Sequence, residues 1–140
     1  MLFTVLVSFF FAGLCTILWQ RIITATDGGR LSWLFIPIES LIGDEYNVNV
    51  RTVVGIIVWF FLSIVFGLLY WYLVESNVLT YYDGLSVGIF TFVLYSISQI
   101  GVLPFFSQGV GGWKISTWLW LESIVSWVLF GVVLWVFVHV

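Results

Sequence analysis

Four long apolar stretches, almost free of charged side chains, divide the chain. Charge-free runs cover 1–20, 52–74 and 84–113, and a fourth run, 115–138, is interrupted only by Glu122. About 20 apolar residues in a helix cross the roughly 30 Å hydrocarbon core of a bilayer, because each residue advances the helix by about 1.5 Å. The runs do not alternate between apolar and polar positions, as the strands of a membrane β-barrel do. Helices are therefore the expected way to satisfy the backbone hydrogen bonds in lipid.

The fold class that follows is an all-α integral membrane protein, with residues 1–140 forming a single membrane domain. We predict a four-transmembrane-helix bundle with spans at 2–20, 53–75, 84–106 and 116–138. The first run opens without a positively charged side chain and lacks a small-residue cleavage site, so we interpret it as a retained helix and not as a signal peptide.

The segment 31–43, between the first two predicted spans, has a helical pattern of its own. Its apolar residues are Leu31, Leu34, Phe35, Ile38, Leu41 and Ile42. Glu39 lies off that apolar face, which is typical of a short amphipathic helix in the membrane interface. Pro37 would break a helix through this segment but suits the first turn of one that starts near Ile36. A re-entrant hairpin is disfavoured because Asp44 and Glu45 follow directly.

Composition agrees with a lipid environment. Hydrophobic residues make up 62% of the chain and charged residues only 8%, against roughly 25% charged in a typical soluble domain. The net charge of −3 and the scattered cations exclude a nucleic-acid-binding surface, which needs clustered Lys and Arg. Cys15 is the single cysteine, so an intramolecular disulfide and a cysteine-based metal site are excluded, and we interpret it as a buried structural thiol.

The placement of the cations predicts an orientation. The positive side chains are Arg21, Arg30, Arg51 and Lys114. All of them fall in or beside the loops after the first and third spans, and the positive-inside rule assigns that side to the cytoplasm. We therefore expect the loops 21–51 and 107–115 to be cytoplasmic, both termini to lie outside, and the membrane to be the plasma membrane.

Small residues recur along the predicted helices and are candidates for helix packing. These packing candidates are Thr4, Ser8, Ala12, Thr16, Gly84 and Gly88. Small side chains let helix backbones approach closely in lipid, where the hydrophobic effect does not drive association. We expect packing within the chain first, and an interface with another subunit or a second copy as the alternative.

Three polar residues are candidates for an ion, proton or polar site. Glu122 lies roughly 10 Å along the fourth helix from Ile115, where a charge costs up to about 3 kcal/mol. It can serve a proton or a cation, or it can pair with Lys114 or a loop arginine near the headgroups. Gln99 can hydrogen-bond Glu122 or another helix. Glu39 is expected to be solvated.

Reactive constellations are absent from the sequence. His139 is the only histidine, which argues against a His-based metal site and against a catalytic triad. We expect no cofactor and no enzymatic activity. The favoured hypothesis is an accessory or assembly subunit of a membrane complex, whose partners are the bilayer and either other membrane subunits or further copies of itself. The alternative is a small homo-oligomeric transporter or channel for a proton, cation or small solute that uses Glu122.

Overall fold

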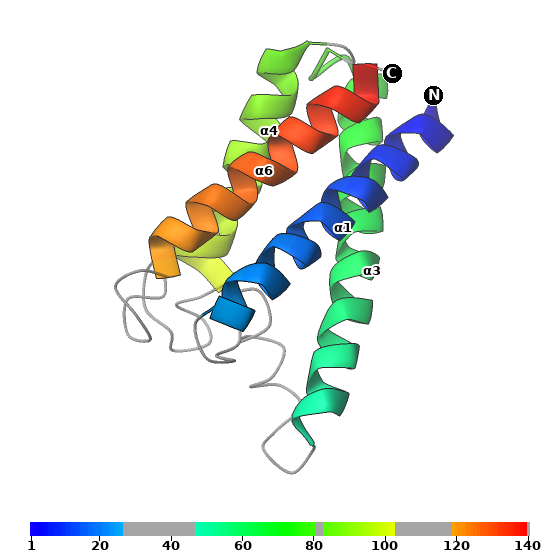
Figure 1. Cartoon of the computed structure of the whole chain (residues 1–140). Helices are drawn as coiled ribbons and strands as arrows, with labels where there is room; N and C mark the ends of the chain where they lie inside the picture. The colour runs from blue at the N-terminus through cyan, green and yellow to red at the C-terminus, as the bar shows by residue number, and fades with distance from the viewer. Residues whose placement is uncertain (27–46, 81–82, 103–118, 140) are drawn as a thin grey trace.

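A computed structural model describes residues 1–26, 47–80, 83–102 and 119–139 (Figure 1). The predicted interfacial segment 31–43, with Glu39, lies outside the described residues. All structural statements below concern the described part of the chain.

This part is entirely helical. Its elements are α1 (Leu2–Thr26), α3 (Val48–Glu75), α4 (Gly84–Ser96), the π-helical segment η1 (Ile97–Val102), and α6 (Leu119–His139). η1 continues α4 without a break, so these elements form four helices that are long and apolar enough to cross a membrane. The prediction of four helices of membrane-spanning length is confirmed.

Two helix ends differ from the ends of the predicted spans, which were placed where charged residues begin. α1 continues to Thr26, so Arg21 lies within the helix and not in a loop. Arg51 likewise lies in the first turn of α3. A charge-free run marks what the hydrocarbon core accepts, whereas helical hydrogen bonding can continue into the interface, where charged side chains are solvated. The predicted span ends 103–106 and 116–118 lie outside the described residues.

α1 is the central helix of the bundle. It packs against both α3 and α6, and α6 packs in turn against α4. The C-terminal end of α3 lies close to the start of α4, and the two helices diverge toward the opposite end of the molecule (Figure 1). The N- and C-termini lie near each other at the end where α3 and α4 meet (Figure 1).

The C-terminal end of α3 is closed by a left-handed residue. Asn77 has a φ of 57°, and its N–H donates to the Val74 carbonyl at 3.0 Å. The Val78 N–H donates to the Leu73 carbonyl at 2.9 Å. These two bonds form a Schellman motif, which satisfies the last carbonyls of a helix and needs a residue that tolerates positive φ.

The start of α4 is fixed by two side chains. Asp83 is the N-cap, and its carboxylate accepts from the Leu85 N–H at 3.0 Å. The Ser86 hydroxyl accepts from the Thr80 N–H at 3.0 Å and so ties the turn to the first turn of the helix. The end of α3 and the start of α4 are therefore both capped.

Aromatic rings fill the centre of the bundle. The Phe9 ring on α1 lies 5.8 Å from Tyr70 on α3, 5.9 Å from Phe90 on α4 and 5.9 Å from Phe130 on α6, measured between centroids. All four side chains are buried. Tilted and edge-to-face contacts of this kind contribute about 0.5–1.5 kcal/mol each beyond the area they bury. Phe9 therefore joins all four helices at one level.

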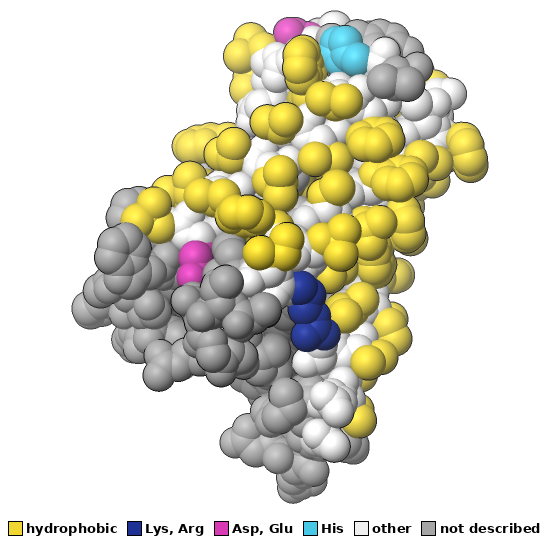
Figure 2. Space-filling view, in the orientation of Figure 1, with side chains coloured by type: hydrophobic (Ala, Val, Ile, Leu, Met, Phe, Trp, Pro, Cys, Tyr) yellow, Lys and Arg dark blue, Asp and Glu magenta, His cyan; other side chains and the backbone are white. Residues whose placement is uncertain are grey.

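The outer surface is apolar over the middle of the helices. Figure 2 shows hydrophobic side chains across that region, whereas acidic and basic side chains lie toward the two ends of the described helices. The largest exposures include Phe3, Phe61, Phe92 and Ile100. Such a surface suits lipid or another apolar partner.

Candidate functional site

Polar side chains from α1 and α6 meet in the interior. The pair that meets is Gln20 on α1 and Ser126 on α6, both buried, and we call it the α1–α6 polar cluster; Thr16 and Ser123 are also buried on these helices. The Gln20 Nε2 donates to the Ser126 Oγ at 2.5 Å. The Ser126 Oγ donates in turn to the Glu122 carbonyl oxygen at 2.8 Å. In an apolar surrounding these bonds hold α1 and α6 in register, because an unsatisfied amide there is costly.

Glu122 lies at the edge of the apolar part of α6. It is half-buried in the first turn, and the stretch long enough to cross a membrane begins at Leu121. The Glu122 carbonyl oxygen accepts from the Ser126 Oγ, so Glu122 borders the polar cluster.

Gln99 lies within η1 and is buried, but it is not joined to Glu122. In the described structure its Nε2 donates to the Ser98 Oγ at 3.3 Å, and its Oε1 has no hydrogen-bond partner. Among the described residues, neither of the two possibilities for Gln99, a bond to Glu122 or a bond to another helix, is formed. The residues after Ser96 continue as a π-helix, whose wider turn changes the direction of every following side chain relative to an α-helix.

The small residues on α1 face the interior. Ser8, Ala12 and Thr16 are buried, and Thr4 is half-buried. The Ser8 and Thr16 hydroxyls donate to carbonyls one turn earlier, on Thr4 and Ala12, at 2.7 and 2.9 Å. Because the hydroxyls are satisfied within the helix, this face presents a narrow surface against which α3 and α6 can pack closely.

α1 and α3 approach closely at Gly13. A Cβ placed there would lie 2.6 Å from the Ser63 Oγ, so a larger residue would require Ser63 to move. Beside it, the Trp59 Nε1 donates to the Gly13 carbonyl oxygen at 3.2 Å. Reasoning from the sequence missed Gly13, Trp59 and Gln20. The signal available for Gln20 was an uncharged polar residue at the end of an apolar run.

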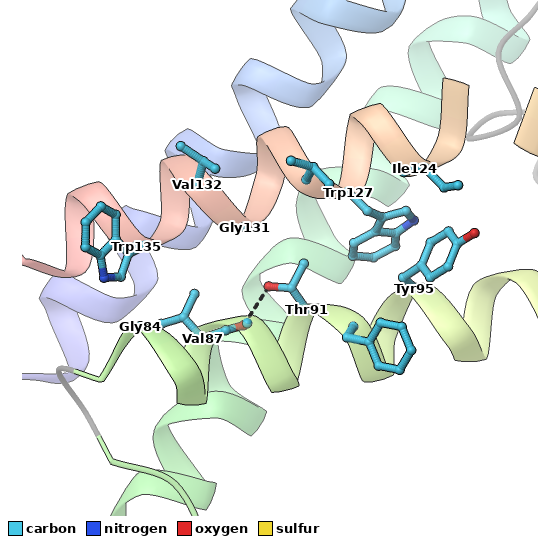
Figure 3. A pocket seen from close by; sticks show the side chains of 12 residues that line it. Gly84, Val87, Thr91, Tyr95, Ile124, Trp127, Gly131, Val132 and Trp135 are labelled. Atoms are coloured by element: carbon cyan, nitrogen blue, oxygen red, sulfur yellow. Dashed lines mark hydrogen bonds between the residues drawn. The ribbon is translucent and has the colours of Figure 1, made fainter. Parts of the chain in front are cut away.

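Gly84 and Gly88 lie beside an apolar groove between α4 and α6 (Figure 3). The groove has a volume of about 590 Å³ and is lined by Gly84, Val87, Gly88, Thr91, Phe92, Tyr95, Ile124, Trp127, Val128, Gly131, Val132 and Trp135. A Cβ on Gly84 would lie 3.0 Å from the Trp135 Nε1, whereas one on Gly88 would meet nothing within 4 Å. Gly88 is therefore open toward the groove and the surroundings.

The floor of the groove is where α4 and α6 touch. A Cβ on Gly131 would lie 3.2 Å from the Thr91 Cγ2. The Thr91 hydroxyl donates to the Val87 carbonyl at 2.8 Å, the bond drawn dashed in Figure 3. The hydroxyl is thus satisfied within its own helix, and the groove presents an apolar wall to an occupant.

The described residues offer little reactive chemistry. They contain no group of three or more His, Cys, Asp or Glu side chains able to hold a metal ion. Cys15 is half-buried and not fully buried as its apolar neighbours suggested. No protein-family model, curated protein or solved structure matches the chain. Function must therefore be argued from packing and from the few polar groups.

Proposed function

We propose that the chain is an integral membrane protein that acts as an accessory or assembly subunit of a membrane complex, without catalytic machinery of its own. The observation that carries the proposal is the aromatic centre around Phe9. It is supported by the four apolar helices, each long enough to cross a bilayer.

The aromatic centre favours a packing role over a passage through one copy. Phe9 contacts Tyr70, Phe90 and Phe130, so rings from all four helices fill the axis at one level. Protein interiors packed in this way leave few voids larger than a water molecule. A hydrated path along the axis would have to displace these rings.

The outer face of α3 is the surface we assign to a partner helix. α3 packs mainly on α1 and leaves an exposed apolar ridge of Val53, Ile57, Phe61, Ile64 and Leu68. These residues recur every three or four positions, which places them on one side of the helix. α3 also has 28 residues, about 42 Å, and is the longest described helix. A transmembrane helix of another subunit can pack along this ridge.

The proposed orientation keeps the termini outside and the loops 21–51 and 107–115 in the cytoplasm. It is supported by the four cations and by the common end at which both termini lie (Figure 1). The membrane we propose is the plasma membrane.

The test is native mass spectrometry of the tagged chain, gently extracted from its own membrane. We expect it to emerge with other subunits in a fixed ratio. Ile57→Ala with Ile64→Ala, on the ridge, should weaken that complex roughly tenfold, the equivalent of about 1.4 kcal/mol. The matched control is Ile97→Ala with Ile100→Ala, which shortens two equally exposed isoleucines on η1.

The control pair should leave the complex intact, and both variants should elute as folded protein. A wild-type chain that emerges alone would overturn the assembly proposal. Equal weakening by both pairs of substitutions would overturn the assignment of the ridge.

A second candidate is a homo-oligomeric transporter or channel for a proton, cation or small solute. It is favoured by the polar cluster of Gln20 and Ser126 directly beside Glu122. Because aromatic rings fill the axis of one copy, the path would run between copies. Flux into proteoliposomes that is lost in Glu122→Gln and kept in the control Glu75→Gln would support this candidate, and absence of any ion- or pH-dependent flux would exclude it.

A further inference from the structure

We propose that the groove between α4 and α6 holds one acyl chain of a zwitterionic glycerophospholipid, from the leaflet on the side of the termini. The proposal rests on membrane insertion but not on any partner subunit. It concerns the face formed by Gly84, Gly88, Thr91 and Gly131, away from the α3 ridge (Figure 3).

The length of the groove matches one leaflet. Its lining runs from Gly84 to Tyr95 on α4 and from Trp135 back to Ile124 on α6. Eleven residue steps at about 1.5 Å make roughly 16 Å, close to half of the roughly 30 Å hydrocarbon core. Gly84 is also the first residue of the apolar stretch that runs to Val102, so on this side the groove starts at one end of the stretch and stops at Tyr95, seven residues short of the other end.

An acyl chain fits this length better than a transmembrane helix does. A transmembrane helix is about 10–12 Å wide with its side chains and continues across both leaflets. At its inner end the groove is lined by Tyr95 on α4 and by Trp127 and Ile124 on α6, and it stops before the end of either helix (Figure 3). An acyl chain that enters from one surface ends at that depth. Lipid tails in the surrounding bilayer are as apolar as the groove, so the hydrophobic effect does not drive binding. The binding free energy comes from dispersion contacts between the acyl chain and the preformed wall of the groove.

The charges at the mouth select the headgroup. Asp83 directly precedes the groove, and the His139 ring packs at a tilt against Trp135, with ring centroids 5.1 Å apart. Glu75 adds a second exposed carboxylate at the same end of the bundle. Among the described residues at this end, the Met1 α-amino group is a cation and no Lys or Arg side chain occurs, so the carboxylates outnumber the cations. An anionic headgroup is repelled there, whereas the ammonium of phosphatidylethanolamine can approach Asp83 and its phosphate or ester oxygens can accept from the Trp135 indole.

The experiment is native mass spectrometry of the isolated chain after a delipidating detergent wash, with phosphatidylethanolamine and phosphatidylglycerol supplied in equal amounts. We expect one retained phospholipid per chain, with the ethanolamine lipid favoured roughly fivefold, as one charge near a membrane surface provides. Gly88→Leu fills the groove, since a Cβ there meets nothing within 4 Å, and should abolish retention. Gly101→Leu is the matched control in open space outside the groove and should keep it.

Two more variants keep the test decisive if Gly88→Leu does not fold. Val132→Trp fills the same groove from α6, and Val136→Trp places the same ring outside it, on a side chain of similar exposure. Asp83→Asn preserves the N-cap acceptor but removes the charge. Lipid should therefore be retained, while the ratio of bound ethanolamine lipid to bound glycerol lipid falls toward one.

Equal lipid retention by wild type and both groove-filling variants would overturn the proposal. The proposal would also be overturned if Gly88→Leu kept its bound lipid but lost a second copy of the chain or another subunit, because the groove would then hold a helix. Equal retention of both headgroups by wild type would overturn the assigned selectivity. Because the isolated chain is measured, failure to find partner subunits leaves this result unaffected.

Discussion

Two glutamines are buried in the described helices, and only one of them bonds across helices. Gln20 donates from α1 to Ser126 on α6 at 2.5 Å, whereas Gln99 donates to its neighbour Ser98. Interhelical hydrogen bonds in membrane proteins contribute about 0.6 kcal/mol on average and up to about 1.7 kcal/mol. The contribution of Gln20 should lie in the upper part of that range, because both partners are fully buried.

A double-mutant cycle measures this contribution. Gln20→Ala, Ser126→Ala and the double variant should give a coupling free energy of about 1–1.7 kcal/mol in unfolding by denaturing detergent. The same cycle between Gln99 and Ser126 should give a coupling near zero. Additive effects of the Gln20 and Ser126 substitutions would show that the two side chains do not stabilise the fold together.

Gly13 provides a steric test of the contact between α1 and α3. Gly13→Ala should destabilise the fold by about 1–3 kcal/mol, because the new methyl group would lie 2.6 Å from the Ser63 Oγ. Adding Ser63→Ala removes that oxygen and should restore part of the loss in the same unfolding assay. Gly101→Ala, where a Cβ meets nothing within 4 Å, is the control and should change little. A Gly13→Ala variant as stable as wild type would show that α1 and α3 do not approach this closely.

Helix ends depend on local residues that can be changed one at a time. Asn77 ends α3 with a φ of 57°, a conformation that costs a β-branched residue about 1–2 kcal/mol. Asn77→Ile should therefore lower the unfolding free energy by about that amount, and Asn77→Gly should leave it within a few tenths of a kcal/mol. Equal stability of the two variants would contradict the Schellman end of α3.

The four long apolar helices of the described residues could be predicted from the sequence, because the length of a charge-free run reports directly on what a bilayer accepts. Their ends could not, since α1 continues through Arg21 to Thr26 under hydrogen bonding that charge does not interrupt. The hydrogen bond between Gln20 and Ser126 could not be predicted from the sequence for another reason. It joins residues 106 positions apart, and only the packing of α1 against α6 brings them together.

The whole molecule has two distinct ends, and its orientation can be tested by labelling. In a Cys15→Ser background, Ser76→Cys lies exposed in the turn at the end shared with the termini, and Asn49→Cys lies exposed at the start of α3. In intact cells we expect a membrane-impermeant maleimide to label Ser76→Cys and not Asn49→Cys. Asn49→Cys should react after permeabilisation. The reverse pattern would invert the orientation, and labelling of both sites in intact cells would contradict a four-span arrangement.

The central place of α1 has a consequence for how the protein is made. α1 leaves the ribosome first, yet one of its two neighbours is α6, which is synthesised last. At about 5–20 residues per second, the 106 residues between Gln20 and Ser126 take roughly 5–20 s to translate. During that interval the amide of Gln20 and the small-residue face of α1 lack their final neighbour, α6. The order of synthesis thus makes the closing of α1 against α6 the last event in the maturation of the bundle.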